Sequence, residues 1–311
     1  MSDTAPLHAH FARLLQMADN LPAMPTSVVA PEKPDALAGA LLGAEYGLIE
    51  PVLIGDAAKI DAVAQAMSKD ISGYELIDTP DHGDAAARGV ALVHEGRTQA
   101  VMKGHLHTDI LLRHVVKREG GLRVGRRLSH IFITDVPGSE RLVLITDGAI
   151  NVLPDLQTKI DTTQSAIDLA RTLGVAVPHV AVLSAVESVT EAVPSTMDAA
   201  EIARLASAGE IKGGVVEGPL SMDIAVDQAA ALGKGLASDV AGRADVMVVP
   251  NLEAGNMFAK ALSHYAGAEK AGVVMGAAVP IILTSRSDGD QARLVSCAVA
   301  ALYEAGKGAL V

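Results

Sequence analysis

The chain has 311 residues, with 25 Lys or Arg against 37 Asp or Glu, and its formal net charge is -12. This charge argues against a surface that binds nucleic acid or an anionic membrane. Half of the residues are apolar, which excludes a disordered chain and is enough for two domains, each with its own core. Aromatic residues make up only 2 %, so a platform for stacking bases is not expected.

Short apolar runs alternate with longer helical patterns in the first part of the chain. Strands are predicted at residues 27 to 31, 50 to 56, 74 to 78, 100 to 104 and 130 to 136. Helices are predicted at residues 35 to 47, 56 to 67, 84 to 96 and 110 to 117. The first three of these helices open with an Asp that can cap the first turn.

The same alternation continues to the end of the chain. Strands are predicted at residues 141 to 147, 177 to 186, 211 to 218, 244 to 251 and 278 to 285. Helices are predicted at residues 157 to 174, 196 to 206 and 255 to 267, and a last helix includes the pattern LVSCAVAAL. Strand and helix in regular alternation indicate the α/β class, with mostly parallel sheets that are covered by helices on both faces.

Ten strands are too many for one small sheet, and residues 136 to 141 are the predicted crossover between two domains. This segment contains Pro137 and Gly138 and joins two strands without a helix. The predicted domains are residues 1 to 139 with 286 to 311, and residues 140 to 285. In open α/β sheets ligands bind beyond the carboxyl ends of the strands, so functional residues are expected directly after strands.

Cys297 is the single cysteine of the chain and lies in the apolar pattern of the last helix. It is predicted to be buried, and no neighbouring group would activate it as a nucleophile. A single cysteine excludes an internal disulfide and fits a reducing compartment. Because no signal pattern and no membrane-length apolar run is found, we expect a cytoplasmic protein.

The segment KGHLHTD, residues 103 to 109, is rich in polar residues and connects a predicted strand to a predicted helix. Thr108 can cap the helix, whose first N–H groups and positive dipole suit a phosphate group. Gly104 would let the backbone approach the anion, and Lys103 would add positive charge. An ordinary capped turn explains the same residues, and so does a metal site formed by His105, His107 and Asp109. No second cluster with ligand spacing supports the metal, so none is predicted.

Four other polar segments also lie beside predicted strands. RVGRR contains Arg126 and Arg127, whose guanidinium groups can bind phosphate in forks. ITDGAIN contains Asp147 and Asn151, and NLEAGNMFAK again leads into a helix. ILTSRSDGD combines Ser285 and Arg286, which could stabilise a carbonyl oxygen that gains charge, with nearby carboxylates that could accept a proton. Each segment alone fits a polar turn, but their shared position favours one functional site.

Several common motifs are missing from the chain. Neither the P-loop pattern nor a G-x-G-x-x-G after a strand occurs, which removes the main support for a kinase or a Rossmann dehydrogenase. The G-x-S-x-G pattern is missing too.

The segments ITDGAIN, PNLEAGN, AGAEKAGVVMG and PIILTSRSD, in this order, resemble the signatures of the phosphate acyltransferase family, the phosphate acetyltransferases and phosphate butyryltransferases. The resemblance runs over nearly the whole chain. It implies transfer of an acyl group between coenzyme A and inorganic phosphate, without a metal or prosthetic group. It also implies two α/β domains with an interdomain cleft, as in isocitrate and isopropylmalate dehydrogenases, and a homodimer.

The resemblance also implies roles for individual residues. Ser285 and Arg286 match the pair that orients and polarises the acyl carbonyl. His107 and Thr108 match the pair at the start of the phosphate-side helix, and Arg126 or Arg127 matches a substrate-binding arginine. Further substrate-binding residues implied in this way are Asp147, Asn151, Glu253, Asn256 and His264.

The chain departs from the acetyl-specific branch at two positions. Six residues after Arg286, where that branch has a catalytic Asp, stands Ala292, so Asp288, Asp290 or a histidine must serve as the base. His264 stands where that branch has an Arg. Both changes look more like the butyryl branch.

The expected reaction fits the residues. Attack of phosphate on a thioester develops negative charge on the carbonyl oxygen, and each fixed donor there contributes about 3 to 4 kcal/mol. In reverse, the coenzyme A thiol must lose a proton, for which Asp288, Asp290 or a histidine is the candidate, and Asp288 is the residue predicted.

Three other functions remain open. Two are enzymatic: a metal-dependent decarboxylating dehydrogenase of related architecture, and a metal hydrolase that uses His105 and His107. The third is a non-catalytic domain that senses acyl-CoA, like the one appended to some malic enzymes.

Overall fold

The computed structural model of the chain describes residues 7 to 284 and 288 to 310. Its described residues form two compact units: residues up to Gly125 with Ala271–Gly306, and Arg126–Lys270 with the residues after Gly306. Compared with the predicted domains, residues 126 to 139 belong to the second unit and residues 271 to 284 to the first. The domain assignment itself stays a prediction.

The strands of the first unit lie in the order β3, β2, β1, β4, β11, β10. Neighbouring strands pair in parallel from β3 to β11, and only β10 is antiparallel to its neighbour β11. Their bounds are β1 (Met24–Val29), β2 (Ile49–Gly55), β3 (Glu75–Asp78), β4 (Ala100–Lys103), β10 (Glu269–Met275) and β11 (Ile281–Ile282).

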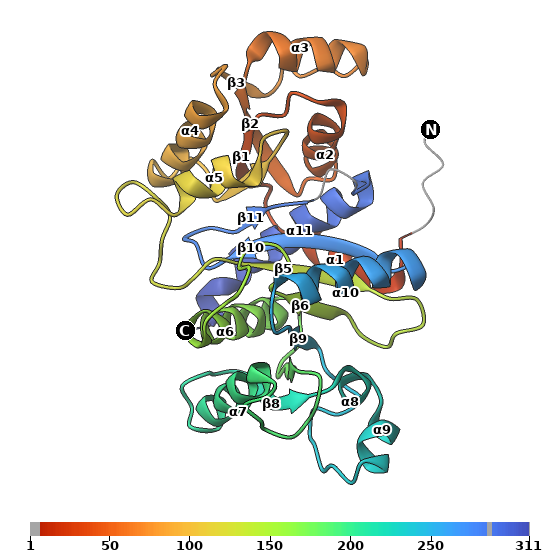
Figure 1. The fold of residues 1–311 in the computed structure, drawn as a ribbon. Coiled ribbons are helices and arrows are strands. Elements are labelled where there is room, and N and C mark those ends of the chain that lie inside the picture. Colours follow the sequence, from red (N-terminus) through yellow and green to blue (C-terminus); the bar gives the residue numbers. More distant parts are fainter. Residues whose placement is uncertain (1–6, 285–287, 311) are drawn as a thin grey trace. The chain divides into compact units, whose positions relative to one another are not determined.

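Helices lie on both faces of these strands (Figure 1). On one side α2 packs against α11 and α11 against α1, and on the other side α4 packs against α5 and β1. Their bounds are α1 (Ala9–Ala18), α2 (Pro34–Glu45), α3 (Ala57–Ala66), α4 (His82–His94), α5 (Thr108–Val115) and α11 (Asp290–Gly306).

The strands of the second unit lie in the order β5, β6, β9, β7, β8. Here β5 and β6 are antiparallel, whereas the other neighbours pair in parallel. Their bounds are β5 (Ser129–Asp135), β6 (Val143–Thr146), β7 (His179–Leu183), β8 (Val215–Leu220) and β9 (Val246–Val248).

The helices of the second unit bury two apolar layers. Helix α6 packs against β5, β6 and β9 and also against α7. A second core joins the strands to α8 and α10, with Ile145, Met247 and Ile224 among its fully buried side chains. The helix bounds are α6 (Leu156–Thr172), α7 (Pro194–Ser207), α8 (Met222–Val226), α9 (Gln228–Gly233) and α10 (Leu252–Tyr265).

The mixed α/β class and the mostly parallel strand pairing are confirmed. Each of the predicted strands coincides with a strand, although β11 and β9 are much shorter than predicted. Strand β10 is not among the predicted strands, because its first residues Glu269 and Lys270 are charged and follow a segment of small residues. In the part of the chain that the structure describes, no helix is both long and apolar enough to span a membrane.

The predicted helix caps are correct at only one of three positions. Asp56 caps α3 by accepting a hydrogen bond from the Lys59 N–H. Helix α4 is instead capped by Asp81, and its start lies before the predicted cap Asp84. Helix α2 begins at Pro34, whose fixed φ suits the first helical position, so Asp35 lies inside the first turn.

Cys297 is fully buried in α11, as predicted, and a side chain at Gly43 would approach its sulfur to 3.0 Å. Burial raises the pKa of the thiol to about 12. We therefore expect the native protein to react very slowly with an aromatic disulfide reagent and to release one equivalent of thiolate after unfolding in denaturant. Rapid stoichiometric labelling of the native protein, followed by absorbance, would contradict this.

Candidate functional site

The start of α5 in the first unit is the predicted phosphate-binding position. The helix begins at Thr108, and the residue before it, His107, has the extended backbone of a cap (φ -67°, ψ 139°) but makes no side-chain cap hydrogen bond. The prediction that Thr108 is the N-cap is therefore wrong by one residue. His107 is exposed and Thr108 is half-buried. The His107 side chain thus accepts no hydrogen bond from the first backbone N–H groups of α5. These N–H groups can donate to an anion instead.

Gly104 is required for a different reason from the predicted one. A Cβ atom at this position would lie 2.4 Å from the carbonyl oxygen of Ala30 and 2.5 Å from that of Val29. The N–H groups of Gly104 and His105 donate to these same two carbonyls, at 2.8 and 2.6 Å. Gly104 therefore lets the loop approach the end of β1, and no ligand is needed to explain it.

Lys103 bends back over the loop that follows it. Its ammonium group donates to the carbonyl oxygens of Gly104 at 3.0 Å and of Leu106 at 3.1 Å. The ammonium charge therefore lies beside the loop that leads into α5, where it also stabilises the loop conformation.

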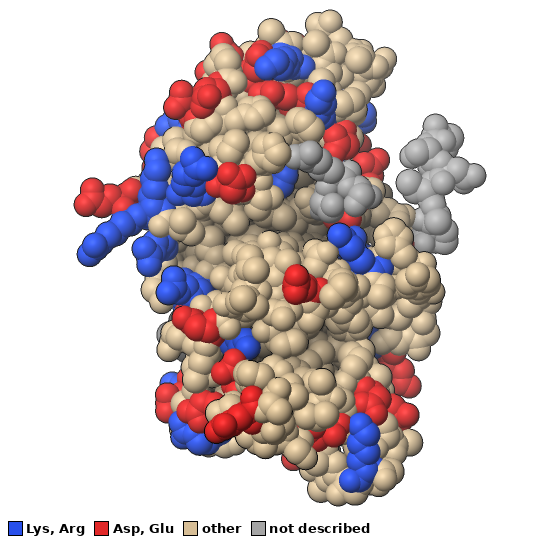
Figure 2. All heavy atoms as spheres, viewed as in Figure 1, with Lys and Arg blue, Asp and Glu red and all other residues tan. Residues whose placement is uncertain are grey.

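Basic side chains gather over the end of α5 and the loop after it (Figure 2). Arg113, Lys117, Arg118 and Arg123 are exposed there. In a chain of net charge -12 this is a local positive surface in the first unit. It offsets the general repulsion of an anionic substrate near α5.

The predicted catalytic segment is described only in part. Ser285 and Arg286 lie outside the described residues. Asp288, the candidate base, is half-buried just before α11. Asp290 begins α11 and lies 3.8 Å from the guanidinium group of Arg293, a buried residue that also pairs with Asp35 at 3.1 Å.

Arg126 and Arg127 lie before β5 in the second unit, and the structure distinguishes between them. Arg126 donates to the Asp168 carboxylate at 2.6 Å, so its guanidinium group is already paired. Arg127 is anchored through its backbone, whose N–H donates to Asp161 at 2.9 Å. Its side chain is exposed, and no ion pair of Arg127 occurs among the described residues.

Asp147 and Asn151 form a closed hydrogen-bonded turn after β6. The buried Asp147 carboxylate accepts from the N–H groups of Ala149, Ile150 and Asn151 at 2.9, 3.1 and 3.1 Å. It also accepts from the Asn151 side chain at 2.6 Å, and this amide donates to the carbonyl oxygen of Leu128 at 2.8 Å. These contacts give both side chains a structural role within the turn. Their predicted role in substrate binding stays a prediction.

The turn after β6 and the start of α10 touch through two glycines. A Cβ atom at Gly148 would lie 3.0 Å from the backbone of Gly255, and one at Gly255 would lie 2.9 Å from Gly148. The Asn256 side chain donates to the Gly148 carbonyl oxygen at 3.1 Å across this contact. The segments ITDGAIN and NLEAGN, far apart in sequence, therefore form one packed structure at the carboxyl ends of β6 and β9.

Helix α10 carries three of the predicted residues. It is capped by Asn251, which accepts from the Ala254 N–H at 2.9 Å. Glu253 is exposed in its first turn and His264 in its last turn, whereas Asn256 is half-buried. Only Glu253 and Asn256 thus lie near the turn of Asp147, and His264 is more than two helical turns away.

A charged cluster after β7 and β8 is not among the predicted sites. The Lys234 ammonium lies 2.8 Å from Glu187 and 2.9 Å from Asp223, and the Ser221 hydroxyl lies within hydrogen-bond distance of the same two carboxylates. The hydrogen bonds from Ser221 and Lys234 lower the pKa of Asp223 to about 2. The only signal for it in the sequence is that Glu187 and Ser221 both follow strands. The cluster holds α8 and α9 to the loop after β7.

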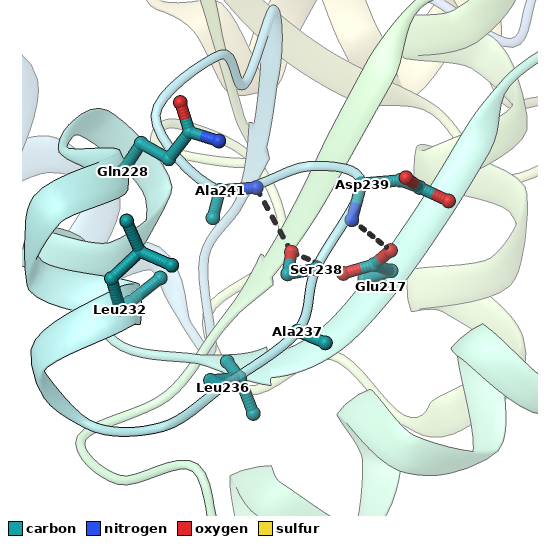
Figure 3. Close-up of a pocket in the computed structure, with 9 residues that line it drawn as sticks. Glu217, Gln228, Leu232, Leu236, Ala237, Ser238, Asp239 and Ala241 are labelled. Atoms are coloured by element: carbon teal, nitrogen blue, oxygen red, sulfur yellow. Dashed lines mark hydrogen bonds between the residues drawn. The ribbon is translucent and has the colours of Figure 1, made fainter.

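A hollow of about 400 Å³ lies beside the edge strand β8 (Figure 3). Leu232 and Leu236 form its apolar wall. On its polar wall the Glu217 carboxylate accepts from Ser238 and from the Asp239 N–H, the latter at 2.9 Å. None of the predicted site residues that the structure describes lines it.

The metal alternative at His105, His107 and Asp109 gains no support from side-chain geometry. Among residues 7 to 284 and 288 to 310 no group of three His, Cys, Asp or Glu side chains is arranged to hold a metal ion. Asp109 is exposed and pairs with Arg113 at 3.3 Å.

Comparison with known proteins identifies similar chains over nearly the whole length. Residues 81 to 301 match the family model described as "Phosphate acetyl/butaryl transferase". A phosphate acetyltransferase of Rhizobium meliloti is 51 % identical over 91 % of this chain and 90 % of its own. A phosphate butyryltransferase of Clostridium acetobutylicum is 37 % identical over 84 % of this chain and 87 % of its own.

Among solved structures, a branched-chain phosphotransacylase from Enterococcus faecalis is similar to this chain with a TM-score of 0.76. The two chains are 28 % identical, and the match covers 90 % of this chain and 99 % of the other. The predicted elements therefore assemble in the way they do in a solved phosphotransacylase.

Proposed function

Because this chain belongs to the phosphate acetyl/butaryl transferase family, we propose that it transfers a short acyl group between coenzyme A and inorganic phosphate. The observation that carries the proposal is 51 % identity to a phosphate acetyltransferase over nearly the whole of both chains. The products are an acyl phosphate and free coenzyme A, and the reaction needs no metal or prosthetic group. The coenzyme A thioester is a substrate and not a cofactor.

The proposed phosphate side of the site is the first turn of α5. His107 and Thr108 present backbone donors and the positive end of the helix dipole, beside the basic surface around α5. Phosphate is already an anion at neutral pH, so these groups need to position it more than to deprotonate it. Of the two arginines before β5, Arg127 is the proposed substrate ligand, since Arg126 is paired with Asp168.

The proposed chemistry is direct attack of a phosphate oxygen on the thioester carbon. Ser285 and Arg286 donate to the carbonyl oxygen as it gains negative charge, and the thiolate of coenzyme A leaves. In the reverse direction Asp288 accepts the thiol proton. No covalent enzyme intermediate is required, which agrees with the burial of Cys297.

The remaining proposals concern acyl chain, assembly and location. The higher identity to the acetyltransferase than to the butyryltransferase supports acetyl-CoA as the preferred substrate, despite Ala292 and His264. A homodimer, a cytoplasmic location and a cleft between two dehydrogenase-like domains follow from the resemblance and stay proposals. Glu253, Asn256, Asp147 and Asn151 would line the coenzyme A side.

A direct assay tests the function. The purified chain is mixed with acetyl-CoA, propionyl-CoA or butyryl-CoA, with and without phosphate, and the free thiol is followed. We expect thiol release to require phosphate, to be fastest with acetyl-CoA, and to persist after treatment with a chelator. Acyl phosphate is trapped as the hydroxamate, so that its amount can be compared with the amount of thiol released. Release without phosphate would identify a thioesterase, and binding of acetyl-CoA without turnover would identify a sensing domain.

A further inference from the structure

One buried carboxylate belongs to a residue that is not among the predicted site residues. Glu32 follows β1 in the first unit, and its side chain is only 5 % exposed. One carboxylate oxygen accepts from the Asp56 N–H at 3.0 Å, and the other lies 3.1 Å from the His82 ring nitrogen and 3.8 Å from the Lys59 ammonium. A carboxylate is this deeply buried only where such partners compensate for the loss of water.

The partners of Glu32 come from the starts of two helices. Asp56 caps α3 directly after β2, and His82 is the first residue of α4. A Cβ atom at Gly55 would lie 3.0 Å from the Glu32 carboxylate and 3.2 Å from the Ala30 backbone. Glu32 therefore ties the end of β1 to the starts of α3 and α4 in closely packed surroundings.

The turn between β1 and Glu32 has an unusual backbone. Ala30 is fully buried and has a left-handed φ of 53°, which residues with a side chain rarely adopt. Such a conformation persists only where the surroundings hold it. Pro31 fixes the next backbone angle, so the anchored side chain of Glu32 constrains the direction of the Ala30 carbonyl.

The Ala30 carbonyl is the acceptor for the loop that leads to α5. It accepts from the His105 N–H at 2.6 Å, and the Val29 carbonyl accepts from the Gly104 N–H at 2.8 Å. Two residues after His105 comes His107, where the proposed phosphate-binding turn begins. The position of this turn is therefore linked to the turn that Glu32 anchors.

We infer that Glu32 is a positioning residue: its bonds to Asp56 and His82 hold the left-handed turn at Ala30, and the Ala30 carbonyl in turn places the 103 to 108 loop for phosphate. The inference rests on the proposed function of that loop. Without the Glu32 carboxylate, the Ala30 turn relaxes and the start of α5 loses its fixed position. Phosphate then binds more weakly, because the donors of α5 no longer meet it in a fixed geometry.

A role in stability alone would have a different signature, and Asp81 supplies the matched control. Its carboxylate accepts from the N–H groups of Gly83 and Asp84 at 2.7 and 3.0 Å, at the same end of α4 that His82 occupies. These bonds remain within α4 and involve neither the Ala30 turn nor the 103 to 108 loop. Asp81→Ala is expected to lower the melting temperature without changing the KM for phosphate.

The test compares Glu32→Ala, Glu32→Gln, His82→Gln and Asp81→Ala in the full chain. For Glu32→Ala we expect the KM for phosphate to rise by about fivefold or more, with the KM for acetyl-CoA within about twofold of the parent. Glu32→Gln is expected to show a smaller rise, since an amide oxygen still accepts from the Asp56 N–H. If Glu32→Ala does not fold, the test is decided by whether the KM for phosphate rises in Glu32→Gln and His82→Gln.

Amide hydrogen exchange separates this inference from the proposed function. The amides of Gly104 and His105 are expected to exchange faster in Glu32→Gln than in the parent or in Asp81→Ala. An unchanged phosphate KM together with unchanged exchange overturns the inference, and so does an equal KM rise in Asp81→Ala. A parent chain without phosphate-dependent turnover refutes the proposed function, and the exchange measurement then still tests the link to the loop.

Discussion

Gly104→Ala is expected to destabilise the chain by at least about 3 kcal/mol, at the upper end for an overpacked site. The added methyl group would lie 2.4 and 2.5 Å from the carbonyl oxygens of Ala30 and Val29. These atoms belong to the backbone of a buried strand end and cannot move aside as a side chain would. The 103 to 108 loop must shift instead, with the loss of its two hydrogen bonds to β1. Denaturant unfolding followed by circular dichroism measures the loss.

The control for this substitution is Gly73→Ala in the same unit. Gly73 is exposed, and a Cβ atom there would meet no atom within 4 Å. We expect a change in the free energy of unfolding within about 0.5 kcal/mol, as for ordinary surface substitutions. If Gly104→Ala unfolded at the same denaturant concentration as Gly73→Ala, this result would contradict the close contact between the loop and the end of β1.

Asp147→Ala is expected to destabilise the chain by about 2 to 4 kcal/mol, because it leaves four part-buried donors without their acceptor. Three backbone N–H groups and the Asn151 amide all donate to this carboxylate. Asp147→Asn is expected to recover only part of the loss. One of its atoms becomes an NH₂ group that faces donors instead of accepting from them. Chemical unfolding measures the stability, and the KM for acetyl-CoA reports any damage to the neighbouring Gly148 and Gly255 contact.

Asp155→Ala is the matched control in the same unit. Asp155 caps α6 through the Thr158 N–H at 2.8 Å, and its loss should cost about 1 kcal/mol, as for other caps. If Asp147→Ala lost no more stability than Asp155→Ala, this result would contradict the closed turn after β6. If Asp147→Ala kept its full stability but lost most of its activity, the result would instead assign Asp147 to substrate binding.

The fold was predictable from the sequence because buried parallel strands and amphipathic helices leave strong local patterns. The ends of the elements depend on backbone geometry that such patterns do not contain. Thr108 has the right side chain for a cap, yet the chain turns one residue earlier, at His107. Strand β10 begins with the charged residues Glu269 and Lys270, and its pairing with β11 through Val273 and Val274 leaves no mark in the local sequence pattern.

The candidate site was predictable as a set of loops but not as a set of contacts. The sequence places Asp147 and Gly104 directly after strands, where ligands are expected. It does not show that Asp147 is surrounded by the donors of its own turn, or that Gly104 faces the carbonyls of β1. The same holds for Lys234, whose partners Glu187 and Asp223 are distant in sequence. Only the folded chain shows that the predicted Arg126 already has Asp168 as its partner.

The burial of Cys297 has a consequence for an enzyme whose product is itself a thiol. When coenzyme A is oxidised to its disulfide, an accessible protein thiolate can attack that disulfide, forming a mixed disulfide and releasing one coenzyme A thiol. Here the one sulfhydryl of the chain is sealed inside α11, and at neutral pH almost none of it is ionised. The oxidised disulfide of coenzyme A therefore meets no accessible thiol on the folded chain, and it is not expected to slow turnover by forming a mixed disulfide.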